Sequence, residues 1–177
     1  MPARPAPRRG TVVVSPSAPD VQRAYRATIG HFASGVTIVT TTGPAGPAGM
    51  TTNAVTSLSL EPPLLLVCFE RRSRTLAVVR ASERFAVNIL RAEDEQLAAV
   101  FASKRVAREK FESVTHVEAH GVPVLDGALA WIACSLRELR PGGDHVIGIG
   151  EVIGMDTGEL RDPLVYYRGR YTTIARG

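Results

Sequence analysis

A succession of short β-branched runs separated by turn residues is the feature that most constrains the fold of this chain. Residues 35–42, GVTIVTTT, predict a strand, and the Gly/Pro-rich residues 43–49 predict a turn, so a hairpin is expected to return through residues 50–59. Because most of the strand-like runs neighbour each other in the sequence, we expect hairpins and antiparallel pairing. The further runs are FAVNIL (85–90), ALAWIACSLRELR (128–140), VIGIGEVIGM (146–155) and two short strands within residues 163–174.

Three helices are expected among these strands. Residues 21–34 place apolar side chains at helical spacing behind Asp20, which can cap the helix, and Gly35 ends the run. Residues 71–82 predict a short helix, and residues 92–103 predict another, whose acidic first turn complements the helix dipole. Seven or eight strands with three helices favour a mainly β fold, an antiparallel barrel with helices packed outside it.

The sequence also predicts one fully buried strand, one turn and two buried cysteines. Residues 64–69 are nearly all apolar, which predicts a strand buried on both faces, whereas residues 122–128, VPVLDGA, predict a turn. Cys68 and Cys134 both lie in apolar strand-like runs. We expect them to be buried free thiols, which suits a reducing cytoplasm.

Length and charge exclude several classes of protein. A chain of 177 residues, 45% apolar and 21% charged, fits one soluble domain and has no apolar run long enough for a transmembrane helix. Residues 1–19 are rich in Pro, Ala and Arg and predict a disordered leader before one domain at residues 20–177. The pair Arg8-Arg9 precedes too short an apolar stretch for an export signal. Most of the net charge of +4 comes from arginines of this leader, so neither nucleic acid nor a membrane is an expected partner.

The sequence contains none of the familiar catalytic motifs. It lacks a nucleophile elbow, a P-loop, a zinc-protease motif and a glycine-rich dinucleotide motif opening a helix. Its four histidines show no metal-ligand spacing, so no metal site is expected. A chain without such side chains, yet rich in small polar loops, indicates a bound cofactor that carries the chemistry.

Three polar segments are the candidates for holding that cofactor. Residues 51–59 contain five hydroxyl side chains and one amide directly before the apolar run 64–69. Residues 70–75 open a helix with Ser, Thr and Arg, which favours anion binding, and residues 101–104 supply a lysine. Together they can surround a phosphate and the heteroatom edge of an aromatic ring. The alternative is an outward-facing Thr/Ser strand beside a solvated run of arginines.

Nine segments, in their order along the chain, carry a resemblance to a known family. They are FASGVTIVTT (32–41), GMTTNAVTSLSLEPPLLLVC (49–68), RRSRT (71–75), FAVNIL (85–90), FASK (101–104), KF (110–111), PVLDGALAWIAC (123–134), GDHVIGIGEV (143–152) and YYRGRY (166–171). From about residue 22 to its end, the chain resembles the flavin reductase-like family, whose fold is the FMN-binding split barrel.

The resemblance implies an antiparallel split β-barrel with flanking helices, in a homodimer that builds its flavin site at the subunit interface. It implies the small reductase component of a two-component flavin-dependent monooxygenase. Such an enzyme uses NADH or NADPH to reduce FMN or FAD and releases the reduced flavin to a partner oxygenase. The sequence does not distinguish FMN from FAD as the flavin, or NADH from NADPH as the hydride donor. Two alternatives stay open: a flavoprotein or electron carrier that holds FMN tightly, and an interaction module whose pocket has lapsed.

The resemblance also assigns residues to the flavin ring. The family pattern Thr-Ala-Asn-Ser-x-x-Ser is matched by Thr51, Asn53 and Ser57. Thr52 and Ala54 depart from it, and Ala54 removes one hydroxyl from the expected pocket. Backbone N–H groups of residues 51–54 are expected to stabilise the negative charge that develops on the ring.

Two further segments are assigned to the phosphate end of the flavin. Ser73, Arg74 and Thr75 match the loop expected near the flavin phosphate or ribityl chain. Ser103 and Lys104 match the FASK segment, whose lysine can neutralise a phosphate.

The last assigned residues concern the nicotinamide. His145 lies in the Gly-Asp-His motif, and the resemblance implies that it helps to place the nicotinamide dinucleotide, which makes it the catalytic candidate. Arg168 and Tyr171 either approach the flavin or pyridine nucleotide or simply close the barrel.

Overall fold

The computed structural model describes residues 19–112 and 114–174. The leader predicted for residues 1–19 lies outside these residues except for Pro19, which begins the first helix, and the domain limits stay a prediction. No helix within the described ranges is long and apolar enough to cross a membrane.

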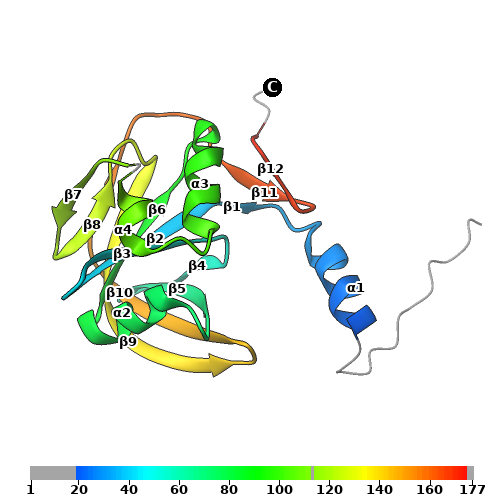
Figure 1. The fold of residues 1–177 in the computed structure, drawn as a ribbon, viewed down its shortest axis with the longest axis horizontal. Coiled ribbons are helices and arrows are strands. Elements are labelled where there is room, and N and C mark those ends of the chain that lie inside the picture. The colour runs from blue at the N-terminus through cyan, green and yellow to red at the C-terminus, as the bar shows by residue number, and fades with distance from the viewer. Residues whose placement is uncertain (1–18, 113, 175–177) are drawn as a thin grey trace, which may run out of the picture.

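Short helices and many strands alternate along the described chain (Figure 1). The helices are α1 (Pro19–Ile29), α2 (Arg74–Ser82), α3 (Glu95–Ala102) and α4 (Ala107–Phe111), with the 3-10 turn η1 (Ala92–Asp94) before α3. The strands are β1 (Ser34–Gly35), β2 (Thr37–Gly43), β3 (Gly46–Thr52), β4 (Val55–Leu60), β5 (Pro63–Glu70), β6 (Arg84–Ile89), β7 (His116–Ala119), β8 (Val122–Leu125), β9 (Ala130–Gly142), β10 (His145–Thr157), β11 (Val165–Tyr167) and β12 (Arg170–Thr172). The described residues hold more strands than the predicted seven or eight, because β1, β7 and β8 were not predicted and because the segment predicted as one strand over residues 50–59 forms β3 and β4.

Seven strands form one sheet in the order β3-β2-β6-β9-β10-β5-β4, and every neighbouring pair is antiparallel. A flat sheet of this size would hold its edge strands about 29 Å apart, at about 4.8 Å per strand. The two edge strands here, β3 and β4, follow each other with only Asn53 and Ala54 between them. Three Cα–Cα steps span at most about 11 Å, so the sheet must curl until its edges meet at one end. Its edges do not pair, which confirms the predicted antiparallel split barrel.

The prediction that residues 50–59 form one returning strand is wrong. Strand β3 pairs with β2 up to Thr52, and β4 then pairs with β5 on the other edge of the sheet. The change of partner begins at Ala54, whose carbonyl accepts a hydrogen bond of 2.9 Å from the Cys68 N–H. Strand propensity is similar on both sides of this point, so the local sequence did not reveal the change.

The core explains why β5 alternates in burial. Leu65, Val67 and Phe69 are buried in a cluster with residues of β2, α2, β6 and β10. Leu64, Leu66 and Cys68, on the other face of β5, are only half-buried, so the predictions of a strand buried on both faces and of a buried Cys68 are wrong. Cys134 is buried and both cysteines are free, as predicted.

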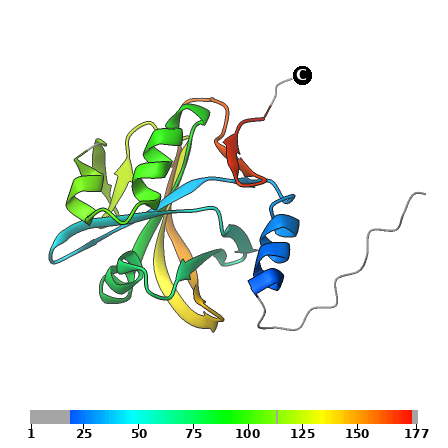
Figure 2. The ribbon, with the colours of Figure 1, turned by 45° about the vertical axis from the view of Figure 1, so that its right-hand side comes forward.

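Helix α1 stands beside the barrel, below β11 and β12, in both views (Figures 1 and 2). The helix predicted for residues 21–34 ends at Ile29: the N–H groups of His31 and Phe32 donate to the Thr28 and Ile29 carbonyls, three residues back instead of four, and the chain then turns into β1. None of the α1 residues is buried, so its expected apolar face is not covered within the described chain.

The turn predicted for residues 122–128 is also wrong in its first half. Residues Val122–Leu125 form β8, which pairs with β7, and all four of them are buried. Pro123 and Gly127 resembled turn signals, whereas long-range packing of β8 against β2 and β6 decided the outcome. Helix α4 was not predicted because its five residues are too few for a periodic pattern.

Candidate functional site

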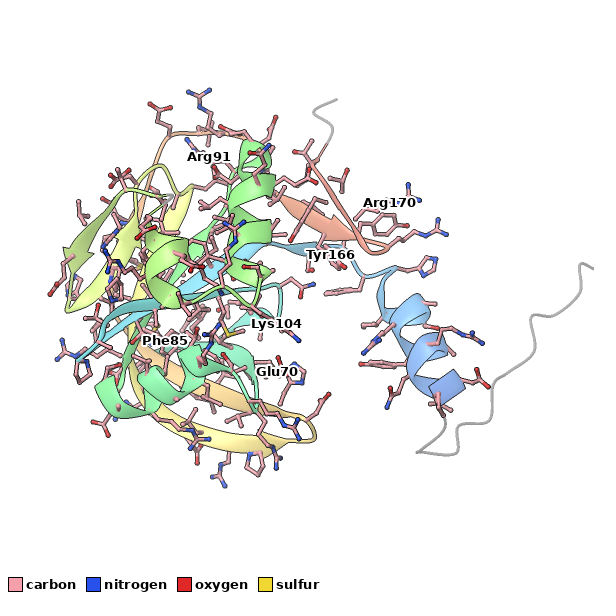
Figure 3. The ribbon with its side chains drawn as sticks, in the orientation of Figure 1. Glu70, Phe85, Arg91, Lys104, Tyr166 and Arg170 are labelled. Carbon is pink, nitrogen blue, oxygen red and sulfur yellow. The ribbon has the colours of Figure 1, made fainter. Side chains whose placement is uncertain are left out.

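Three of the predicted segments meet at one pocket of about 620 Å³, here called the polar pocket. The end of β3, the start of α2 and the segment after α3 form its walls, and α4 contributes one residue. Its lining residues are Met50, Thr51, Glu70, Arg72, Ser73, Arg74, Thr75, Phe101, Ala102, Ser103, Lys104 and Lys110. Lys104 and Glu70 lie on the side of the body that faces α1 (Figure 3). Four basic side chains and one acidic side chain in this lining favour an anionic ligand.

The start of α2 is built to face an anion. Ser73 is the N-cap, and its Oγ accepts a hydrogen bond of 3.4 Å from the Leu76 N–H and donates one of 3.2 Å to the Met50 sulfur. No acidic residue occupies the first turn of α2, so the positive end of the helix dipole is not neutralised by the helix itself.

Arg74 joins two walls of the polar pocket. Its Nη2 donates hydrogen bonds of 2.6 and 2.7 Å to the carbonyls of Lys104 and Arg105. These bonds hold the segment after α3 against the start of α2, so Arg74 and Lys104 stay on neighbouring walls of the pocket.

Sequence reasoning missed Lys110, the buried member of this set. Its side chain is 6% exposed, and its Nζ donates to the Phe101 carbonyl at 2.8 Å and approaches the Gly49 carbonyl at 3.5 Å. Burial, and then the positive charge of Arg74, lower the pKa of Lys110. The available signals were its place in the KF segment and the presence of only two lysines in the chain.

A second pocket, the apolar pocket, has a volume of about 840 Å³ and separates α1 from the barrel. Most of its lining is apolar or aromatic, and the lining residues are Tyr25, Arg26, Ile29, Gly30, Phe32, Ser34, Asn53, Ala54, Val55, Thr56, Leu66, Cys68, His145, Tyr166 and Gly169. A flat aromatic ligand therefore suits this pocket, which includes three predicted residues: Asn53, Ala54 and His145.

His145 lies at the start of β10, opposite Glu70 of the polar pocket in the strand register. Its side chain is about half exposed (46%), and its Nδ1 lies 2.8 Å from Oδ1 of Asp144. That hydrogen bond lowers the pKa of the Asp144 carboxyl, so the carboxylate can fix the orientation of the imidazole.

A third, smaller pocket of about 220 Å³ shares lining residues with each of the other two. It is lined by Val36, Thr51, Thr52, Asn53, Tyr166 and Tyr171. It shares Thr51 with the polar pocket, and Asn53 and Tyr166 with the apolar pocket. Burial raises the pKa of the Tyr171 hydroxyl, whose ring packs 5.6 Å from that of Tyr166. Residues 51–54 therefore line three neighbouring pockets, with the polar pocket at the Thr51 end and the apolar pocket at the Ala54 end.

Much of the hydrogen-bonding capacity of this segment shapes the site itself. Thr51 Oγ1 donates to the Ala98 carbonyl at 2.6 Å, and Asn53 Nδ2 donates to Ser34 Oγ at 2.9 Å. The Ala54 N–H donates to Thr52 Oγ1 at 3.1 Å, so this amide already has an acceptor within the chain. The many small polar groups of the segment thus fix the turn between the two sheet edges.

Two predicted residues lie away from these pockets. Ser57 is exposed in β4 and is absent from the pocket linings given above. Arg168 is exposed, has a φ of 50°, and donates its N–H to the Gly30 carbonyl at 2.7 Å. Its neighbour Gly169 lines the apolar pocket instead. A contact of either side chain with a cofactor stays a prediction. Within the described ranges, no group of three or more His, Cys, Asp or Glu is placed to hold a metal ion.

Comparison with known proteins agrees with this geometry. Residues 29–175 match the model of the family described as "Flavin reductase like domain". The chain is 39% identical over 153 residues to the flavin-dependent monooxygenase reductase subunit HsaB of Rhodococcus jostii, covering 86% of this chain and 77% of that relative. It is 36% identical over 175 residues to the FMN reductase (NADH) RutF of Ancylobacter novellus, covering 98% and 97%.

A solved structure supports the same assignment. The NADH:FAD oxidoreductase SgcE6 of Streptomyces globisporus, in complex with NAD and FAD fragments, superposes with a TM-score of 0.83 at 35% identity, over 92% of this chain and 98% of that one. The chain therefore belongs to the flavin reductase-like family.

Proposed function

We propose that this chain is an NADH- or NADPH-dependent flavin reductase that reduces FMN or FAD and releases the reduced flavin to a partner monooxygenase. The observation that carries the proposal is that residues 51–54 line neighbouring pockets, one rich in cationic side chains and one mostly apolar. A flavin nucleotide has the matching shape, with phosphate at one end and a flat ring system at the other. The names of HsaB, RutF and SgcE6 support the reaction and the partner.

Under this proposal, each part of the site binds or orients one part of the flavin or the nicotinamide. The start of α2 and Lys104 hold the phosphate, and residues 51–54 hold the edge of the ring. Phe32 and Tyr166 provide aromatic walls of the apolar pocket, and His145 orients the nicotinamide. The bound flavin supplies the redox chemistry by accepting a hydride from the nicotinamide. The protein contributes proximity and orientation, so the reaction requires no side chain acting as a general base.

The oxidation of NADH by purified protein, followed by its absorbance with and without added FMN or FAD, tests the proposal. Turnover that saturates with added flavin is the expected result. A yellow protein without turnover of free flavin would favour the tightly bound flavoprotein instead. A protein that binds no flavin and oxidises neither NADH nor NADPH would favour the lapsed pocket.

Replacing His145 with asparagine is expected to raise KM for NADH about 2- to 12-fold and to leave KM for the flavin nearly unchanged. One lost hydrogen bond of about 0.5–1.5 kcal/mol corresponds to this range. Steady-state kinetics with each substrate varied in turn provide the measurement. His116→Asn, in β7 on the opposite side of the body from α1 (Figure 1), is the control and should change neither constant. An unchanged KM for NADH in His145→Asn would contradict the proposed role of His145 in orienting the nicotinamide.

We infer that the protein is a homodimer whose second subunit covers α1. Tyr25, Ile29 and Phe32 expose 64%, 49% and 73% of their surface, although they line the apolar pocket. Exposed aromatic side chains grouped around a pocket are typical of protein interfaces. A second subunit on this face would also close the apolar pocket to solvent.

Light scattering after size exclusion is expected to give twice the chain mass of 19.0 kDa. Phe32→Glu is expected to shift the protein toward the monomer, because it places a charge in the interface. Val117→Glu makes a comparable change at an exposed position of β7 and should leave the mass unchanged. A wild-type protein of 19.0 kDa at working concentration would contradict the homodimer.

We also infer a cytoplasmic location. The two cysteines are free thiols, and burial raises the pKa of Cys134 to about 12 and also raises that of Cys68. Unpaired, unreactive thiols suit a reducing compartment, where NADH is also available.

A further inference from the structure

Lys110 occupies an uncommon position for a lysine. Its side chain is buried, yet it lines the polar pocket together with Arg74 and Lys104. Lysine is rarely buried to this degree, because taking an ammonium group out of water is costly. An apolar side chain would fill the same space without that cost, so the charge itself requires an explanation.

The contacts of Lys110 connect it to the walls that surround the pocket. Its Nζ donates to the carbonyl of Phe101, in the last turn of α3, where a positive charge complements the helix dipole. It also approaches the Gly49 carbonyl of β3, two residues before Thr51. The ammonium group therefore lies where β3 and α3 meet, beneath the segment that presents Ser103 and Lys104.

The electrostatics of this pocket favour a bound anion. Arg74 lies close enough for its charge to lower the pKa of Lys110, after the larger effect of burial. Two cations that disfavour each other are both stabilised when a dianion is placed between them. Because Lys110 is buried, water screens its attraction for such an anion much less than that of an exposed lysine.

We propose that Lys110 is a specificity-determining residue, a buried cation that makes the site select flavins bearing a phosphate over riboflavin. The inference rests on the proposed flavin-binding function and adds to it the group that distinguishes the phosphorylated ligand. Lys104 and Arg74 are exposed, so they attract the phosphate from the solvent side of the pocket. Lys110 acts from within the protein, on the phosphate side of residues 51–54.

The test compares the dissociation constants of FMN and riboflavin, measured by flavin fluorescence, in wild type and Lys110→Met. Riboflavin lacks only the phosphate, so the ratio of the two constants isolates the phosphate contribution. We expect Lys110→Met to reduce the preference for FMN at least about tenfold, as the loss of a charge-assisted hydrogen bond predicts. Arg108→Met, on the same helix with a 90% exposed side chain, removes the same net charge and should keep the ratio. Equal weakening of both ligands by Lys110→Met, or no change in either, would overturn the proposal.

A measurement on the unmodified protein covers the case in which Lys110→Met does not fold. The chain has only two lysines, so NMR of lysine-labelled protein gives two side-chain signals, assigned with Lys104→Arg. FMN is expected to raise the pKa of Lys110, whereas riboflavin should leave it almost unchanged. An FMN effect confined to Lys104 would refute the assignment of Lys110. Wild type that binds neither flavin would refute the proposed function as well. Wild type that binds FMN and oxidises NADH, with the FMN preference intact in Lys110→Met, would refute the role of Lys110 alone.

Discussion

Replacing Arg74 with methionine is expected to weaken FMN binding by about 10- to 100-fold. A hydrogen bond to a charged group contributes about 1.5–3 kcal/mol, and each 1.4 kcal/mol corresponds to about tenfold in affinity. Arg74 also holds the Lys104 and Arg105 carbonyls at 2.6 and 2.7 Å, so its loss frees the segment that carries Lys104. Fluorescence titration with FMN is the direct measurement.

Arg80→Met is the matched control for Arg74→Met. Arg80 lies in the last turn of the same helix, is exposed, and is absent from the polar pocket lining. The substitution Arg80→Met removes the same charge as Arg74→Met. It should change FMN affinity less than about twofold, because solvent screens a distant exposed charge. Arg74→Lys keeps the charge but replaces the planar guanidinium by a compact ammonium group, so its FMN affinity is expected to lie between those of wild type and Arg74→Met. Equal affinities in Arg74→Met and Arg80→Met would mean that the phosphate binds elsewhere.

Replacing Leu90 with alanine is expected to lower the free energy of unfolding by about 2–5 kcal/mol. Leu90 is 1% exposed and packs with Val36, Ile38 and Leu164 in the cluster that also contains Phe101 of α3. Truncating a buried leucine removes its contacts and leaves a cavity that the curled sheet can close only in part. Urea denaturation without flavin provides the measurement, since bound ligand would add its own stabilisation.

Leu160→Ala makes the same chemical change at a residue that is 93% exposed. It is expected to change the free energy of unfolding by less than about 0.5 kcal/mol. Similar losses in Leu90→Ala and Leu160→Ala would contradict the burial that distinguishes the two positions.

The polar end of the candidate site was largely predictable from the sequence, because its residues belong to short motifs whose chemistry is local. A serine directly before a helix commonly caps it, as Ser73 caps α2. Lys104 lies in the exposed segment directly after α3. The structure brings both residues together with Thr51 in the lining of one pocket. In the sequence, Lys110 stood out only as part of the matched segment KF (110–111). Its burial was not predictable, because it depends on which elements of the folded chain cover it.

The apolar end was much less predictable. Tyr25 and Phe32 fall at helical spacing within the helix predicted for residues 21–34, whereas Phe32 lies beyond the end of α1, and both side chains are exposed and line the apolar pocket. Leu66 and Cys68 were read as buried on a two-sided strand, whereas they face that same pocket. The hydrophobicity of a side chain shows that its burial is favourable, but it does not identify the surface that will cover the side chain.

By itself the sequence determined the mainly antiparallel character of the fold, the presence of α1, α2 and α3, and the segments that line the polar pocket. These depend on the strand propensity, turn residues and capping groups of adjacent positions. Only the tertiary structure decided that the chain changes sheet edge at Asn53 and Ala54, that the curled sheet brings α2, α3 and α4 around one pocket, and that Lys110 is buried beneath it. These features depend on pairing between strands far apart in the chain, whose energies are not encoded in any local pattern.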